Sequence, residues 1–148
     1  MTKELNSGPS GDAQIPSMHF DVTLPAQVSA ISPVVGWVLR LLSDLDLAEG
    51  KEFEIEMALR EALANAVLHG CEEDPSKKIE CSVTGDRGQG ILIVVRDPGN
   101  GFDPNSIPSP TDGPNLESDH GRGILLINKL MDEVKHEQNG TVIRMRKF

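Results

Sequence analysis

The feature that most constrains the fold is the stretch from Lys51 to His69, which has the composition of one uninterrupted helix. Good helix formers occupy it throughout, and Gly70 follows where helices commonly end at a glycine. The positions expected to face the core are Ile55, Leu59, Ala62 and Ala66. Such a helix must bury its apolar side against another element, so the rest of the sequence should supply that element.

Short runs of alternating or continuous apolar residues on either side of this helix predict a sheet. We expect strands over 18–24, 77–84, 91–95, 133–137 and 141–146, and further helices over 28–47 and 124–131. Turns are predicted at 85–90 and at Asn139-Gly140. The order β-α-α-β-β-loop-α-β-β predicts an α+β fold, a two-layer sandwich with a mixed, mostly antiparallel sheet and helices on one face.

Individual side chains carry further expectations. Pro33 should lie in the first turns of the 28–47 helix, where a missing N–H costs least. The apolar stripe of that helix is predicted to be Val28, Ile31, Val35, Val38, Leu39, Leu42 and Leu45. The lone Trp37 should pack on the core side of the same helix, and His19 and His136 should lie on strand surfaces. The histidines do not have the spacing of metal ligands.

Length and charge bound the class of protein. The chain has 148 residues, enough for one domain with its own core. Residues 1–17 are rich in Gly, Ser and polar residues without periodicity, so we expect a mobile tail there and the domain over 18–148. The net charge of −9 repels a phosphate backbone, so direct nucleic-acid binding is not expected.

The cysteines and the apolar stretches indicate in which cellular compartment the protein is expected. Cys71 and Cys81 are too few for a disulfide framework and form no CxxC pair. The longest apolar stretch, 31–42, contains a proline, a glycine and an arginine and is too short to span a bilayer. We therefore expect a cytoplasmic protein without a membrane partner.

Glu61 and Asn65 are the first candidate site residues. They stand four apart on the predicted helix and therefore share one face, which continues to His69. A carboxylate beside a neutral amide oxygen suits general-base and hard-cation chemistry. By itself, the pair is also typical of a solvated polar face.

The second candidate directly follows the predicted strand 91–95. The segment from Asp97 to Pro104 places a carboxylate at the end of a buried strand, followed by Gly99 and Gly101. Glycines let a backbone approach a ligand closely, so the carboxylate would sit at the edge of a pocket. The alternative is a Gly/Pro turn capped by the aspartate, which the D-x-G-x-G-F pattern after a strand disfavours.

The third candidate is Gly121-Arg122-Gly123, at the end of a long loop rich in proline. Loops of this length inside a compact domain are usually lids or binding loops. Where the glycines open the next helix, backbone N–H groups and Arg122 would favour an anion. A flexible hinge is the alternative, but it leaves Arg122 without a role. The sequence contains no G-x-x-x-x-G-K phosphate loop and no G-x-S-x-G nucleophile motif.

Taken in order, these segments resemble the boxes of the GHKL (Bergerat-fold) ATPase family. Glu61–Gly70 resembles its N-box, and Asp97–Pro104 resembles its first glycine box. His120–Val134, with its M-D-E-V ending, resembles the second glycine box of the small anti-sigma-factor serine kinases of the RsbW/SpoIIAB type, and Gly140-Thr141 resembles the final box. The resemblance covers 18–148 and implies the Bergerat ATP-binding fold, with ATP and Mg²⁺ as cofactors.

The resemblance implies a role for each polar residue. Asn65 would ligate the Mg²⁺ that bridges the nucleotide phosphates, and Glu61 would act as general base toward the incoming hydroxyl or position it. Asp97 would accept a hydrogen bond from the adenine amino group. Thr141 would support that contact through water.

The resemblance also implies roles for the glycines. Gly99 and Gly101 would let the chain pass close to the base. An ATP lid would span about 104–120. The residues that would close on the phosphates at its end are Gly121, Arg122 and Gly123.

The function implied by this resemblance is an ATP- and Mg²⁺-dependent serine/threonine protein kinase that is also an anti-sigma factor. It would bind a sigma factor and phosphorylate a STAS-domain anti-anti-sigma protein, and a homodimer is left open. Two alternatives stay open: a nucleotide-gated binding switch without turnover, and a detached catalytic domain that acts on a response regulator. Glu61 distinguishes the kinase from the switch, because a switch needs Asn65 and Asp97 but no base.

Overall fold

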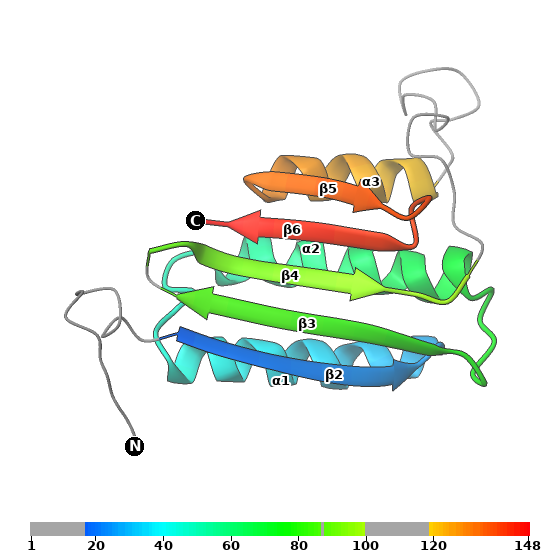
Figure 1. Cartoon of the computed structure of the whole chain (residues 1–148), viewed down its shortest axis with the longest axis horizontal. Helices are drawn as coiled ribbons and strands as arrows, with labels where there is room; N and C mark the ends of the chain where they lie inside the picture. The colour runs from blue at the N-terminus through cyan, green and yellow to red at the C-terminus, as the bar shows by residue number, and fades with distance from the viewer. Residues whose placement is uncertain (1–16, 87, 100–118) are drawn as a thin grey trace.

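The computed structural model describes residues 17–86, 88–99 and 119–148 (Figure 1). Within these residues, five strands form one sheet in the order β2-β3-β4-β6-β5, and each of the four pairings is antiparallel. The strands are β2 (Ser17–Pro25), β3 (Lys78–Asp86), β4 (Gly90–Arg96), β5 (Glu133–Glu137) and β6 (Val142–Lys147). All five lie where the sequence predicts them, with ends that differ by at most two residues.

Two of the expectations fall almost entirely outside the described residues. The expected tail, 1–17, reaches them only at Ser17, and the expected lid, 104–120, reaches them only at Asp119 and His120. The tail, the lid and the domain boundary between residues 17 and 18 therefore stay predictions.

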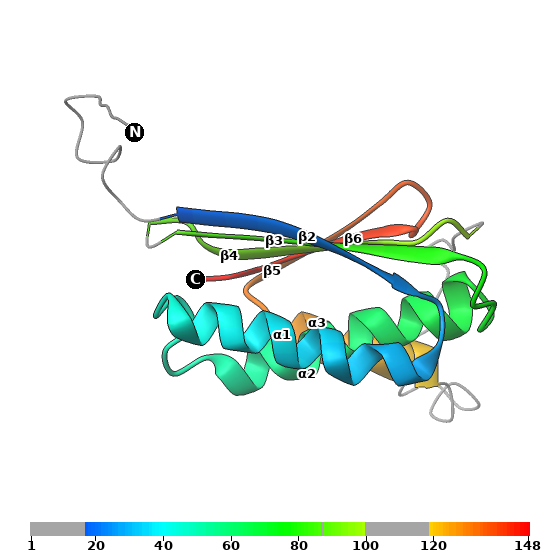
Figure 2. The same cartoon turned by 90° about the horizontal axis from the view of Figure 1, so that it is seen from below.

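Helices cover one face of the sheet, as expected, and Figure 2 shows the two layers edge-on. Within the described residues they are α1 (Ile31–Asp44), α2 (Glu52–Asn65) and α3 (Asp119–Leu130), with a 3₁₀ turn η2 (Val28–Ala30) before α1 and a π turn η3 (Ala66–Gly70) after α2. In Figure 1, α1 runs behind the edge strand β2, and α2 runs behind the middle of the sheet. The α+β fold class is confirmed. None of the helices in the described part of the chain is both long and apolar enough to cross a bilayer.

The core lies between α2 and the central strands. Every second residue of these strands is buried toward the helices, because side chains of a strand alternate between its faces. The buried strand residues are Ile79, Cys81 and Val83 on β3 and Ile91, Ile93 and Val95 on β4. From the helix side, the four positions predicted to face the core are all buried: Ile55, Leu59, Ala62 and Ala66. The core therefore fixes α2 against the centre of the sheet.

The helix α1 is shorter than predicted, and Pro33 lies in its first turn as expected. Its buried residues are Ile31, Val35, Val38 and Leu42. Val28 and Leu45 were expected in the core, but they flank the α-helix and are 54% and 43% exposed. The apolar stripe predicted from the sequence is therefore correct only where the backbone is α-helical.

The expectation that Trp37 packs on the core side of α1 is wrong. Its side chain is 42% exposed, and its ring meets that of Phe20 edge-on, with 4.8 Å between the ring centroids. Phe20 belongs to β2, which is the edge strand of the sheet. A helix beneath an edge strand can cover only part of its apolar surface, so Trp37 lies at the rim of the core.

The C-terminal end of α2 also differs from the predicted single helix. The N–H of Cys71 donates to the carbonyl oxygen of Ala66 at 2.8 Å, which closes a π turn. The residues in the left-handed region are Glu72 and Glu73, with φ angles of 53° and 60°. Gly70 is therefore not the C-cap that the sequence predicts. It lies inside the π turn, in which one extra residue widens the helix.

The last helix and the last hairpin complete the fold. Helix α3 begins at Asp119, so Gly121-Arg122-Gly123 lies within its first turns rather than before them. The hairpin turn between β5 and β6 contains three residues with positive φ: Gln138, Asn139 and Gly140. The predicted Asn139-Gly140 turn is thus confirmed, and Thr141 belongs to the turn region rather than to β6.

Candidate functional site

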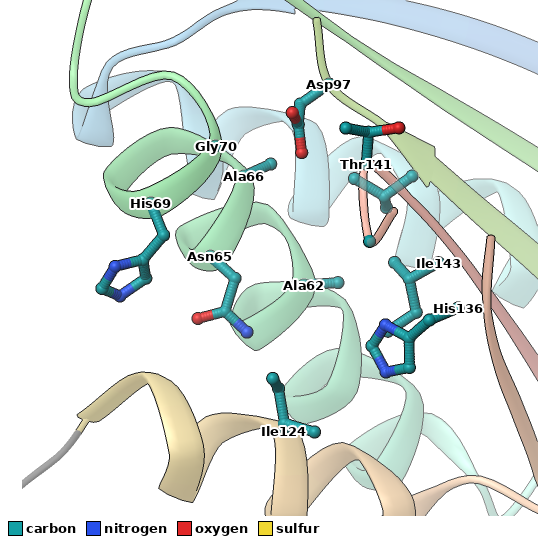
Figure 3. Close-up of a pocket in the computed structure, with 12 residues that line it drawn as sticks. Ala62, Asn65, Ala66, His69, Gly70, Asp97, Ile124, His136, Thr141 and Ile143 are labelled. Atoms are coloured by element: carbon teal, nitrogen blue, oxygen red, sulfur yellow. The ribbon is translucent and has the colours of Figure 1, made fainter. Parts of the chain in front are cut away.

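A cavity of about 260 Å³ lies between the C-terminal half of α2, the start of α3 and the ends of the central strands. Figure 3 shows polar side chains around it, with Asp97 and Thr141 close together and Asn65 and His69 on the helix side. The lining residues are Ala62, Asn65, Ala66, His69, Gly70, Val95, Asp97, Ile124, His136, Gly140, Thr141 and Ile143. The cavity is therefore mostly apolar with a few polar groups at its edges, the usual composition of a small-molecule site.

Asp97 stands immediately after β4, at one wall of the cavity. Its N–H donates to the carbonyl oxygen of Thr141 at 2.9 Å, and its carboxylate Oδ1 accepts the N–H of Gly99 at 2.8 Å. Burial raises the pKa of the Asp97 carboxyl, while the Gly99 N–H and the Lys77 ammonium lower that pKa in part. A carboxylate held in this way is a fixed hydrogen-bond acceptor beside an apolar cavity.

Thr141 follows the hairpin turn and borders the cavity next to Asp97 (Figure 3). Its hydroxyl donates to the carbonyl oxygen of Gln138 at 2.8 Å, within the turn. The backbone hydrogen bond from Asp97 to Thr141 ties the end of β4 to the start of β6. The structure thus brings together two residues that are far apart in the sequence and that sequence analysis placed in one site.

Glu61 and Asn65 lie on the side of α2 that meets α3. A Cβ atom built on Gly123 would lie 2.5 Å from Glu61 Oε2 and 3.6 Å from Asn65 Nδ2. Any residue other than glycine at 123 would therefore displace the Glu61 carboxylate. Asn65 also borders the cavity, whereas Glu61 does not line it. Asn65 thus borders both the cavity and the α2–α3 contact at which Glu61 lies.

Three other residues are expected in the site, Gly101, Gly121 and Arg122, and of these Arg122 does not line the cavity. Arg122 is exposed on α3, and Gly121 precedes it in the same helix. Gly101 lies outside the described residues. The expected role of Gly121 and Arg122 in closing on phosphates, and that of Gly101 near the base, stay predictions.

His136 is a cavity residue that sequence analysis missed. It was expected on a strand surface, as His19 is, but it is half-buried and lines the cavity beside Ile143, its partner in the β5–β6 register. Burial lowers the pKa of the His136 imidazole. Strand alternation could have found it, since Val134, two residues earlier on the same face, packs against the core.

The described residues near α3 would hold a cation only if a bound phosphate supplied further ligands. The described residues contain no group of three or more His, Cys, Asp or Glu side chains that could hold a metal ion. Mg²⁺ usually binds through one or two protein ligands and completes its shell with water and phosphate oxygens. The amide oxygen of Asn65, at the edge of the cavity, fits a Mg²⁺ ion that arrives with a phosphorylated ligand.

Comparison with known families identifies the family of this chain. The sequence model of the histidine kinase-like ATPase domain matches residues 24–147, a range that includes Glu61, the cavity and the start of α3. The chain belongs to the histidine kinase-like ATPase family. Membership of this ATPase family implies that the protein uses ATP.

Proteins of similar sequence carry consistent names. An anti-sigma F factor from Heyndrickxia coagulans is 32% identical over 120 residues, covering 77% of this chain and 78% of the relative. A serine-protein kinase RsbW from Halalkalibacterium halodurans is 32% identical over 142 residues, covering 88% and 86%. An anti-sigma F factor from Bacillus subtilis is 30% identical over 136 residues, covering 88% and 90%. The similarity extends over most of each protein.

Proposed function

We propose that the chain is an ATP- and Mg²⁺-dependent serine/threonine protein kinase and an anti-sigma factor. In this proposal it binds a sigma factor and phosphorylates a STAS-domain anti-anti-sigma protein. The names of its relatives, anti-sigma F factor and serine-protein kinase RsbW, support the proposal because the likeness spans most of each chain. The proposal includes a cytoplasmic location, no direct nucleic-acid contact, and a homodimer as one assembly to be tested.

The observation that carries the proposal is that one helix joins both parts of the site. Asn65 borders the cavity that has Asp97 at its wall, and Glu61, one turn earlier on α2, lies against Gly123 of α3 outside the cavity. A ligand with its base in the cavity and its phosphates beside Asn65 would extend toward Glu61. This arrangement supports transfer of a terminal phosphate, because it provides a carboxylate beyond the binding pocket.

The cavity would hold the adenine base. Its volume of about 260 Å³ lies just below the range of about 300–1,000 Å³ for ligand pockets, so it suits the base rather than the whole nucleotide. Asp97 provides an acceptor for the 6-amino group of adenine, supported by Thr141. Guanine carries a carbonyl oxygen at that position, which a carboxylate repels. Gly99 lets the chain pass close to the base, and Gly101 would do the same.

Asn65 would hold Mg²⁺ through its amide oxygen. When bound, Mg²⁺ neutralises phosphate charge, which together with positioning supplies most of the catalysis of phosphoryl transfer. A chain with a net charge of −9 depends on such a source of positive charge at a phosphate site. Gly121, Arg122 and Gly123 would add backbone N–H groups and one guanidinium at the start of α3.

Glu61 would take the proton of the incoming serine or threonine hydroxyl, or hold that hydroxyl in place. Its carboxylate is half-buried where α2 meets α3, with Gly123 against Oε2. A general base must lie within hydrogen-bond reach of the proton it removes, and the α2–α3 contact would hold Glu61 on the phosphate side of Asn65.

The proposal is tested by mixing the full chain with γ-labelled ATP, Mg²⁺ and a STAS-domain protein encoded near its gene. We expect label on a serine or threonine of the STAS protein, and we expect Asn65→Ala to remove most of the Mg²⁺ dependence of ATP binding. Asn128→Ala is the matched control, because Asn128 is exposed on α3. Calorimetry of ATP with and without Mg²⁺ measures the binding.

Other outcomes would favour the two alternatives. If ATP alters sigma binding but no STAS protein receives phosphate, the chain is a nucleotide-gated switch without turnover. If label appears on a response regulator instead, the chain is a detached catalytic domain.

A further inference from the structure

Gly70, the last residue of the π turn, lies directly against the carboxylate of Asp97. A Cβ atom built on Gly70 would lie 2.5 Å from Asp97 Cγ, 2.5 Å from Oδ2 and 2.7 Å from Oδ1. Contacts this short do not occur, so the carboxylate occupies the space that any side chain at 70 would need. Figure 3 shows both residues at the same end of the cavity.

Gly99 encloses the same carboxylate from another side. Its N–H donates to Asp97 Oδ1 at 2.8 Å, and a Cβ atom built on it would collide with the carbonyl oxygen of Gly70. The Asp97 carboxylate is thus packed between two stretches of glycine backbone, one from η3 and one from the segment after β4. The position of this acceptor depends on both glycines.

Backbone conformation does not account for a glycine at position 70. The glycines of the described chain that have positive φ are Gly50, Gly90 and Gly140. Gly70 is not among them, so the requirement is for space rather than for conformational freedom. The π turn creates this requirement, because the Cys71–Ala66 hydrogen bond keeps the chain coiled through Gly70, next to the end of β4.

We propose that Gly70 is a positioning residue for nucleotide selectivity and that it acts through Asp97. Because Gly70 has no side chain, the Asp97 carboxylate can pack against the π turn η3 at the end of α2. From this position the carboxylate faces the cavity. A methyl group at 70 would push the carboxylate out of this seat and away from the 6-amino group of a bound adenine. The inference rests on the proposed recognition of adenine by Asp97.

A double-mutant cycle of the full chain tests this inference with Gly70→Ala, Asp97→Ala and the combined variant. The ligands are ATP and purine riboside triphosphate, which lacks the 6-amino group, and calorimetry yields the ratio of their dissociation constants. Asp97→Ala should lower the preference for ATP about tenfold or more, as expected for one hydrogen bond to a charged group. Gly70→Ala should cause a comparable loss, but it should cause almost none in the Asp97→Ala background.

Thermal unfolding of the same proteins separates positioning from a folding defect. The methyl group of Gly70→Ala clashes with atoms that Asp97→Ala removes, so the combined variant should be about as stable as Asp97→Ala alone. Gly36→Ala is the matched control, because no atom lies within 4 Å of a Cβ atom built on Gly36. This control should leave the ATP preference unchanged. If Gly70→Ala alone does not fold, a combined variant that also fails to fold overturns the inference.

The outcomes distinguish this inference from the proposed function. If Gly70→Ala keeps the ATP preference while Asp97→Ala loses it, the inference is overturned and the proposed function stands. If the two losses are additive, Gly70 does not act through Asp97, and the inference is again overturned. If Asp97→Ala itself keeps the preference, the proposed role of Asp97 is wrong, and the inference falls with it.

Discussion

The two ends of the site are held by different kinds of interaction. At the proposed base end, the Asp97 N–H donates to the Thr141 carbonyl oxygen at 2.9 Å, and the Asp97 carboxylate accepts the Gly99 N–H at 2.8 Å. At the proposed phosphate end, Glu61 and Gly123 belong to different helices and meet through close packing. Hydrogen bonds at the ends of sheet strands define the position of an acceptor, whereas packed helices can shift by about 1–2 Å against each other. The base end is therefore suited to recognition, and the rate of transfer should depend on the phosphate end.

Glu61→Ala should have the largest effect, and only on rate. A general base contributes about 10²–10⁴-fold, so transfer to the STAS protein should fall by that factor. ATP affinity should change little, because Glu61 does not line the cavity. Glu61→Gln should behave similarly, since an amide cannot take up the proton. Single-turnover transfer and calorimetry measure the two effects, with exposed Glu49→Ala as control. Full transfer by Glu61→Ala would show that another group is the base.

Gly123→Ala tests whether the distance between the helices sets the rate. Its Cβ atom would press on Glu61 Oε2, and a misplacement of about 1 Å can lower a rate about 10²-fold. We expect kcat to fall by up to that factor at nearly unchanged ATP affinity. Alanine is the better helix former by about 1 kcal/mol, and the Glu61 side chain can swing aside, so Tm should not fall. An unchanged kcat would contradict the comparison between the two ends.

Asp97→Asn should weaken ATP binding but raise the stability of the nucleotide-free protein. Loss of a hydrogen bond to a charged acceptor should weaken ATP binding about 10–100-fold in calorimetry. Burial raises the pKa of Asp97 above 3.8, so the parent loses stability as pH rises from that value through the folded-state pKa. Asp97→Asn removes this loss, so the nucleotide-free variant should have the higher Tm at pH 7. A lower Tm at pH 7 would mean that the carboxylate stabilises the fold.

His136→Gln should have the smallest effect, visible in the pH dependence of stability. Burial lowers the pKa of His136 below 6.5, so the unfolded chain takes up a proton that the folded chain resists. Stability of the parent should therefore decline as pH falls below 6.5, until the folded-state pKa is reached. The variant should show a flatter dependence of Tm on pH in that window. Equal slopes in parent and variant would show that His136 does not titrate differently on folding.

Much of the site could be predicted because its signals are local in the sequence. The four-residue spacing of Glu61 and Asn65 places both on one side of a helix whatever that helix packs against. Asp97 at the end of an apolar run and the turn at Asn139-Gly140 are likewise properties of short segments. The order of these segments carried the resemblance to an ATPase family, which the family comparison confirmed.

The residues that were misplaced depend on neighbours that are distant in the sequence. Trp37 lies on an apolar helix, but its burial depends on how far the sheet extends beyond β2. His136 is polar, and it is half-buried because α2, α3 and β6 surround one face of a short strand. Periodicity reports which side of an element a residue occupies, but it does not report what covers that side.

The sequence by itself determined the elements, their order and the chemical groups available for binding and transfer. Only the tertiary structure decided that Gly70 lies against Asp97 and that Gly123 faces Glu61, because each contact joins segments far apart in the chain. A glycine that is required for space leaves no periodic pattern in the sequence. The requirement can be recognised only when the atoms that occupy the space of its missing side chain are known.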